Sequence, residues 1–198
     1  MPRKQEAVAH ALLRRIGKTM TSIMLDLETM GKSPNAAIIA IGAVEFNPES
    51  HTIGKKFYTI IDLDSAVDAG GVIDADTVLW WLKQSDETRA ALTDGITVSV
   101  VVALQQFLKW CAGLGNKKDL KVWGNGAAFD NVVLKSAYDR LGLAVPWHYW
   151  NDRCYRTIKS LHPDIPMQFV GIKHTAICDA ESQAEHLMAM LPKLGKSL

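Results

Sequence analysis

The sequence predicts a mixed α/β domain in which strands come first and helices follow. Three apolar, β-rich runs lie in the first third of the chain, at 22–27, 37–46 and 56–62. After the paired glycines at 70–71 the apolar spacing becomes helical, and only one short apolar run, at 120–123, interrupts it. Strands followed by a mixture of helices and a further strand, without internal repeats, are typical of a mixed-sheet domain.

The first three apolar runs are joined by short links rich in turn residues. Gly31, Pro34 and Asn35 lie in the first link, and Asn47 and Pro48 lie in the second. Parallel neighbours need a crossover of a dozen or more residues, whereas antiparallel neighbours need only a tight connection. We therefore expect these three strands to form an antiparallel meander.

The remaining elements are expected to be helices separated by glycine and proline. Val98, Val101 and Leu108 keep the spacing of a buried helix face, Gly142 follows a second helix, and Pro192 follows the last. The expected helices span residues 74–84, 86–93, 97–112, 130–141, 153–161 and 179–191.

Length and composition predict one soluble globular domain. The chain has 198 residues, 48% of them hydrophobic and 22% charged, and single domains usually have about 100–200 residues. No apolar run approaches the roughly 18 residues of a membrane span, and the N-terminus lacks the apolar stretch of a secretory signal. We therefore expect a cytoplasmic protein without membrane contact. Cys111, Cys154 and Cys178 form no CxxC pair and are expected to be free thiols.

The net charge of +1 is unevenly distributed along the chain. Residues 1–19 contain five basic residues and one glutamate, which leaves 17 basic and 20 acidic residues in the rest. We interpret 1–19 as a basic N-terminal extension, either a poorly packed tail or an arm for nucleic acid or membrane, and 20–195 as the domain. A domain that binds nucleic acid through a basic surface alone would be far more positive. Such a function would need another way to neutralise phosphate.

Two carboxylates stand at the end of the first apolar run. Asp26 and Glu28 are one residue apart on an expected strand, so their side chains point to the same face. Adjacent carboxylates repel each other unless a cation lies between them, and oxygen ligands of this kind suit Mg²⁺ or Mn²⁺. The alternative is that Asp26 is a solvated edge-strand residue and Glu28 belongs to the following turn. The spacing alone does not decide between the two.

Two further motifs lie at the starts of expected helices. Asp130 ends the run 124–130, which contains Gly124, Asn125 and Gly126, and Asp is also a favoured N-cap. His174 precedes Asp179 by five residues at the last helix. A lone histidine in such a place is commonly a surface or capping residue. Taken singly, neither motif distinguishes chemistry from capping.

Together the three motifs resemble those of the DEDDh exonuclease superfamily. Its patterns are Asp-x-Glu-Thr, then Asn-x-x-x-Phe-Asp, then His-x-x-x-x-Asp-Ala, and the chain has them in this order at 26–29, 125–130 and 174–180. The resemblance extends over about residues 20–191 and implies a ribonuclease-H-like fold, with a central mixed five-stranded sheet flanked by helices. The run 26–44, with Trp80-Trp81 and Gln84-Ser85, is similar to a phage and bacterial branch of exonuclease VIII-like and mycobacterial exoribonuclease-like proteins.

The resemblance implies a 3′-5′ exonuclease that hydrolyses phosphodiester bonds at the 3′ end of single-stranded RNA or DNA and releases 5′-mononucleotides. It implies two divalent cations, Mg²⁺ or Mn²⁺, that stabilise the attacking and leaving oxygens, and it makes His174 the general base that takes a proton from the attacking water. Bound cations would also explain how a slightly acidic domain holds a polyanion. The ligands that it implies for the cations are Asp26, Glu28, Asp130 and Asp179.

Substrate contacts are expected beside the first two motifs. The resemblance implies that Thr29 and Met30 lie against the terminal nucleotide, with Asn125 nearby, and a partly buried Met30 is the alternative. Trp80 and Trp81 are adjacent on an expected helix and face about 100° apart, so one can stack on a base while the other packs in the core. Trp81 is our candidate for the substrate contact, and Trp80 is the alternative.

Several other interpretations stay open. A zinc module built from Cys154, His162, His174 and Cys178 matches no common structural zinc spacing and leaves the acidic residues unexplained. A non-catalytic nucleic-acid or partner-binding domain could keep the same fold, and an enzyme restricted to very short oligonucleotides could keep the same site. The resemblance also suggests a homodimer, although no feature of the chain identifies an interface. The sequence does not distinguish RNA from DNA as the substrate.

Overall fold

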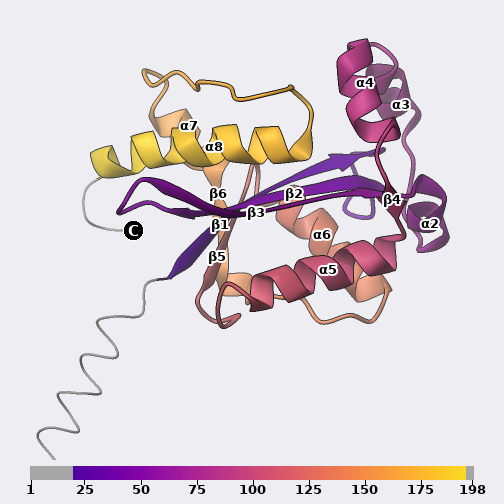
Figure 1. Ribbon diagram of the computed structural model, residues 1–198, viewed down its shortest axis with the longest axis horizontal. Helices are drawn as coiled ribbons and strands as arrows, with labels where there is room; N and C mark the ends of the chain where they lie inside the picture. Colours follow the sequence, from indigo (N-terminus) through magenta and orange to yellow (C-terminus); the bar gives the residue numbers. More distant parts are fainter. Residues whose placement is uncertain (1–19, 195–198) are drawn as a thin grey trace, which may run out of the picture.

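The computed structural model describes residues 20–194, and its centre is a six-stranded sheet in the order β4-β3-β2-β1-β5-β6 (Figure 1). The antiparallel pairings of β1 with β2 and of β2 with β3 confirm the expected meander, while β4, β5 and β6 pair in parallel with β3, β1 and β5. The strands are β1 (Thr21–Thr29), β2 (Ile38–Asn47), β3 (Thr52–Ile61), β4 (Thr97–Val98), β5 (Leu120–Gly124) and β6 (Asp152–Cys154).

The expected number of five strands is wrong by one, and the reason is the length of the outer strands. β4 has two residues and β6 has three, so neither is long enough to show the alternation that identifies a strand. Thr97–Val98 lies directly before Ser99, the N-cap of the next helix. The expected helix 97–112 therefore includes all of β4, and the expected helix 153–161 includes the last two residues of β6.

Helices cover both faces of the sheet. α8 packs against β1 and β2 with α7 beside it, while α5 and α6 lie on the opposite face (Figure 1). Successive residues of β1 accordingly enter different cores, because Ile23 and Leu25 belong to the α5 and α6 side and Met24 belongs to the α7 and α8 side. The helices are α2 (Leu63–Asp68), α3 (Ala75–Trp81), α4 (Asp86–Thr93), α5 (Val100–Ala112), α6 (Asp130–Arg140), α7 (Tyr155–Leu161) and α8 (Ala176–Met190).

The helix ends follow from local capping. The side chains of Asp74, Ser85 and Ser99 accept hydrogen bonds from backbone N–H groups in the first turns of α3, α4 and α5. α2 was not expected, and α8 begins three residues before the expected start at Asp179. Two short 3₁₀ turns, η1 (Tyr149–Asn151) and η2 (Leu191–Leu194), complete the structure.

Three expectations concern the cysteines, membrane spans and the N-terminal extension. The three cysteines are free thiols, as expected, with Cys111 buried. Within residues 20–194, no helix combines the length and the apolar character needed to cross a membrane. The basic extension 1–19 lies outside the described residues, so its role stays a prediction.

Candidate active site

The three sequence motifs meet at the carboxyl end of β1. β5 runs parallel to β1, with Gly124 paired to Leu25, so the start of α6 lies beside the end of β1. The start of α8 reaches the same place because Gly42, opposite Asp26 on β2, has no side chain. A Cβ atom there would lie only 2.2 Å from the backbone carbon of Ala176. A close helix–strand contact thus sets the position of α8.

Three carboxylates are grouped at this junction. Asp26 and Glu28 from β1 and Asp179 from α8 each offer an oxygen, and these oxygens lie within 4.8 Å of one another. The expected common face of Asp26 and Glu28 follows from the period of two along β1. One turn after Asp179, the side-chain amide of Gln183 donates a hydrogen bond to Asp26 Oδ1 at 2.8 Å.

Asp130 lies next to this group but is held differently. It is the first residue of α6. Its Oδ1 accepts a hydrogen bond from the backbone N–H of Leu27 at 3.3 Å, and the residue is only 3% exposed. The backbone N–H groups of Asp130 itself and of Asn125 also favour its ionised form. The contact with Leu27 directs this aspartate at β1.

Burial raises the pKa values of all four carboxyl groups, and repulsion from neighbouring carboxylates raises those of Asp26 and Glu28 further. Desolvation is the largest cause at each residue. The pKa of Glu28 rises to about 8, with added repulsion from Asp179 and Asp130. The pKa of Asp130 rises to about 7, and the pKa of Asp26 rises well above its usual range. The site therefore disfavours four negative charges unless positive charge is supplied.

The donor set fits divalent cations. Among the buried polar atoms of the described residues, Asp130 Oδ2, Asp179 Oδ2 and Gln183 Oε1 have no hydrogen-bond partner. Unpartnered buried oxygens are costly, and hard oxygen ligands are those that Mg²⁺ and Mn²⁺ prefer. A bound cation would offset the repulsion between the carboxylates and would also give the unpartnered oxygens a ligand bond.

His174 stands directly before α8, at the rim of the carboxylate group. Its backbone is left-handed, with φ of 60°, which is uncommon for a residue with a side chain. Its charge and its backbone N–H both favour the ionised form of Asp179, which places the two residues together. The imidazole meets the Trp80 ring edge-on, with 4.9 Å between ring centroids.

A cleft of about 480 Å³ opens beside Glu28. Trp80 is 42% exposed at this cleft, whereas Trp81 is 6% exposed and its indole N–H donates to the Thr29 carbonyl at 3.0 Å. Of the two rings, Trp80 is thus the more accessible to a ligand. The lining residues are Leu27, Glu28, Thr29, Gly31, Lys32, Asp76, Thr77, Trp80, Trp81 and Phe129.

Of the other candidate substrate residues, Thr29 lines this cleft, whereas Met30 and Asn125 do not. The Thr29 hydroxyl donates to the Gly31 carbonyl at 2.7 Å. Met30 packs against the core and lines a separate apolar pocket of about 200 Å³. The carbonyl of Asn125 accepts a hydrogen bond from the Arg156 guanidinium at 2.8 Å. Their roles in substrate binding stay predictions.

Sequence reasoning missed Gln183 and Arg156. The i,i+4 spacing of Asp179 and Gln183 puts both side chains on one face of α8, so the spacing was a usable signal for Gln183. No local pattern identified Arg156, whose charge favours the ionised form of Asp130 from a different element, α7.

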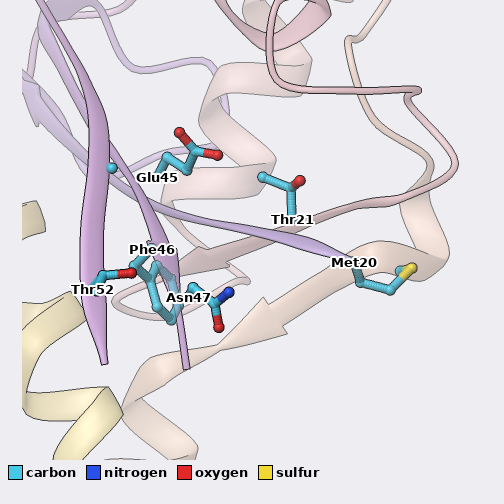
Figure 2. A pocket seen from close by; sticks show the side chains of 7 residues that line it. Met20, Thr21, Glu45, Phe46, Asn47 and Thr52 are labelled. Atoms are coloured by element: carbon cyan, nitrogen blue, oxygen red, sulfur yellow. The ribbon is translucent and has the colours of Figure 1, made fainter. Parts of the chain in front are cut away.

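A second pocket lacks this chemistry. Figure 2 shows a hollow of about 260 Å³ lined by Met20, Thr21, Glu45, Phe46, Asn47, Thr52 and Gly54, at the start of β1 and the β2–β3 hairpin. Its one carboxylate, Glu45, accepts a hydrogen bond from the backbone N–H of Lys55. Among residues 20–194 the carboxylate trio is the only group of three or more His, Cys, Asp or Glu side chains whose geometry could hold a metal ion, so the zinc alternative gains no support.

Comparison with known proteins agrees with this geometry. A family model described as the 3′-5′ exoribonuclease Rv2179c-like domain matches residues 21–191. The chain is similar to the nuclease domain of 3′hExo, a DEDDh family member bound to rAMP, with a TM-score of 0.60, 15% identity, and coverage of 89% of this chain and 94% of that chain. E. coli exonuclease I in complex with a 5cy-dA13 oligonucleotide gives a TM-score of 0.57 and 15% identity, over 88% of this chain and 41% of that chain.

These similarities concern the fold. Both structures share under a fifth of their residues with this chain, and none of the curated proteins matches it in sequence. The ribonuclease-H-like fold predicted from the motifs is confirmed.

Proposed function

Because the chain belongs to the Rv2179c-like 3′-5′ exoribonuclease domain family, it is a nuclease of the DEDDh superfamily, and we propose that it trims single-stranded RNA from the 3′ end with divalent cations. One observation carries the proposal: oxygens of Asp26, Glu28 and Asp179 lie within 4.8 Å of one another, beside the buried Asp130. RNA is chosen over DNA because the family is described as exoribonucleases.

The four carboxylates are the proposed ligands. Asp26 and Glu28 come from one strand face, while Asp130 and Asp179 come from the starts of two helices. When bound, two divalent cations supply positive charge to the attacking and leaving oxygens of the phosphodiester. Gln183 holds the Asp26 carboxylate through its hydrogen bond, which limits the positions that this ligand can adopt.

His174 is the proposed general base. It lies at the rim of the site, next to Asp179, and is partly exposed. From there its imidazole can accept a proton from the attacking water and pass it to solvent, and a positioned base of this kind contributes about 10²–10⁴ in rate. The Trp80 ring packs against His174 and limits how far the imidazole can turn.

The cleft beside Glu28 is the proposed site of the 3′-terminal nucleotide. Its exposed ring, Trp80, can stack on a base of any identity, because every base has a π-face. Trp81 stays buried and holds the Thr29 carbonyl, which keeps the end of β1 in place. In this proposal Trp80 contacts the substrate and Trp81 supports the site.

The test is a time course on matched single-stranded RNA and DNA oligonucleotides with Mg²⁺, Mn²⁺ or EDTA. A label at the 5′ end should give a ladder that shortens stepwise, and a label at the 3′-terminal nucleotide should be released at once as a mononucleotide. Both results should vanish in EDTA and in Asp26→Asn. Release of a labelled 5′ nucleotide before the ladder forms would contradict the polarity, and equal rates in EDTA would contradict the metal requirement.

Two alternatives are distinguished by the same samples. A non-catalytic binding domain on this fold would give no ladder with any cation while still retaining the labelled strand. An enzyme restricted to very short oligonucleotides would cleave dinucleotides and trinucleotides but leave a longer strand intact.

A further inference from the structure

An exposed group of aromatic rings lies on η1, away from both cores. Tyr149 is 73% exposed and Trp150 is 53% exposed. The His148 and Trp150 rings are stacked, with 4.0 Å between centroids and 8° between planes, and Tyr149 meets Trp150 edge-on at 5.2 Å. Large aromatic side chains contribute most to stability when buried. A cluster of exposed aromatic rings at the surface indicates a binding site for a ligand or another macromolecule.

Basic side chains surround these rings. The backbone N–H of His148 donates to the Lys117 carbonyl, and the side-chain amide of Asn151 donates to the Lys118 carbonyl at 2.9 Å. These two hydrogen bonds hold the segment with Lys117 and Lys118 against η1. Both lysines are exposed. Their charges contribute, after desolvation, to a lowered pKa of His148. Arg153 adds a third cation, and its guanidinium donates to the Trp150 carbonyl at 2.9 Å.

Few acidic side chains lie near the rings, and the nearest in sequence, Asp152, has partners of its own. Asp152 accepts hydrogen bonds from Trp147 and Asn131 and pairs with Lys135. Asp119 follows the lysines in sequence. The charge of Glu49, in the β2–β3 turn, favours the protonated form of Lys121. The side chains that face outward around the rings therefore form a surface with a positive balance. We call it the aromatic–basic patch, and it consists of Lys117, Lys118, His148, Tyr149, Trp150 and Arg153.

The patch lies at the start of β5, and the carboxylates lie just beyond its other end. β5 begins at Leu120, just after the lysines, and ends at Gly124 beside the site. Leu120 pairs with Thr21 of β1, and Asp26 and Glu28 lie five and seven residues further along that strand. At about 3.3 Å per residue, the carboxylates are therefore roughly 17–23 Å from the start of β5. β6 runs in the same direction and begins directly after η1. A strand whose 3′ end enters the cleft can therefore reach the patch a few nucleotides upstream.

We propose that the aromatic–basic patch is a second binding site for single-stranded RNA and holds nucleotides upstream of the 3′ end being cleaved. This inference rests on the proposed function, since the RNA that it binds is the substrate. Charge complementarity favours this occupant, because cations that flank exposed rings match a polyanion with stackable bases. Stacking on aromatic side chains is tolerant of sequence, as a trimming enzyme requires. A protein partner or a second copy of the chain would use the rings without needing stackable bases, and the test below distinguishes both from RNA.

The proposal separates binding from chemistry. A long RNA should engage both the cleft and the patch, whereas a trinucleotide should engage only the cleft. Loss of the patch should therefore raise KM for an RNA of about 15 nucleotides by roughly tenfold, which corresponds to the loss of about one stacked base. It should leave kcat, and KM for the trinucleotide, unchanged.

Two variants and two controls test this. Tyr149→Ala with Trp150→Ala removes the rings, and Lys117→Glu with Lys118→Glu reverses the charge without touching them. Leu161→Ala and Lys159→Glu are the controls, because both residues are exposed on α7, which packs against α8, and neither belongs to the patch. Circular dichroism and thermal unfolding check that each variant folds. If the variant without the rings does not fold, the lysine variant still tests the patch.

The readouts are KM and kcat for the two RNA lengths, together with fluorescence anisotropy of the 5′-labelled longer RNA in EDTA. Weaker anisotropy binding and a raised KM in both patch variants, but in neither control, would support the proposal. Unchanged affinity for the longer RNA would overturn it, as would a change of oligomeric state on sedimentation that accounts for the loss. If the wild type hydrolyses neither RNA, the proposed function fails, and anisotropy still shows whether the patch binds the strand.

Discussion

Removing divalent cations at alkaline pH should destabilise the folded protein because of the Glu28 carboxyl group. This residue is 7% exposed, and its folded pKa is about 8, against an ordinary value of 4.5. Between these two values the unfolded chain has released the proton while the folded chain still holds it. Stability is therefore greatest at or below the unfolded pKa and falls as the pH rises towards the folded pKa.

The size of this effect follows from the shift. One pKa unit corresponds to about 1.4 kcal/mol, so the Glu28 shift alone is worth a few kcal/mol, and Asp26 and Asp130 shift in the same direction. For a chain of this length 1 kcal/mol changes Tm by about 2–4 °C. Tm in EDTA should thus fall by about 10 °C between pH 5 and pH 8. Mg²⁺ at about 100 times its Kd should restore about 2.7 kcal/mol at pH 8.

Thermal unfolding with and without EDTA at the two pH values measures this directly. Glu28→Gln should remove a large part of the pH dependence, because glutamine carries no charge at either pH. Glu185→Gln is the control, since Glu185 is exposed on α8. Equal Tm values at pH 5 and pH 8 in EDTA would refute the reasoning, and so would an equal effect of the two substitutions.

Three further predictions concern single side chains. His174→Ala should lower kcat by about 10²–10⁴ and leave KM nearly unchanged, and an effect on KM alone would count against a general base. Trp80→Ala should raise KM roughly tenfold with little change in Tm, whereas Trp81→Ala should lower Tm by several degrees, by about 2–4 °C per kcal/mol lost; similar Tm losses in both would make Trp80 structural. Gln183→Ala should raise the Mg²⁺ concentration for half-maximal activity about 10–100-fold, and an unchanged Mg²⁺ dependence would show that it does not position Asp26.

The sequence predicted those parts of the fold that have long periodic segments. The meander of β1, β2 and β3 and the helices α4 and α6 lie close to their expected ranges. β4 and β6 were missed because two or three residues cannot show a period. α8 begins at Ala176 because Gly42 permits close contact with β2, and this contact joins residues far apart in sequence.

The candidate site was predicted unevenly for the same reason. The period of two along β1 puts Asp26 and Glu28 on one face, and the start of α8 puts Asp179 beside them. Both features could be predicted from the local pattern of each motif. Which tryptophan faces the cleft depends on how α3 packs over Thr29, and helical spacing of adjacent residues does not decide this. The stacked rings on η1 had no local signal either, because their exposure is a property of the folded surface.

The most direct test of the central claim is the rate of 3′-end hydrolysis as a function of Mg²⁺ concentration in Asp179→Asn and Glu185→Gln. Both substitutions remove one carboxylate from α8, but only Asp179 belongs to the group of oxygens within 4.8 Å. The account predicts wild-type activity in Glu185→Gln and loss of metal-dependent hydrolysis in Asp179→Asn, with the fold retained. Full activity in Asp179→Asn, or an equal loss in both variants, would contradict it.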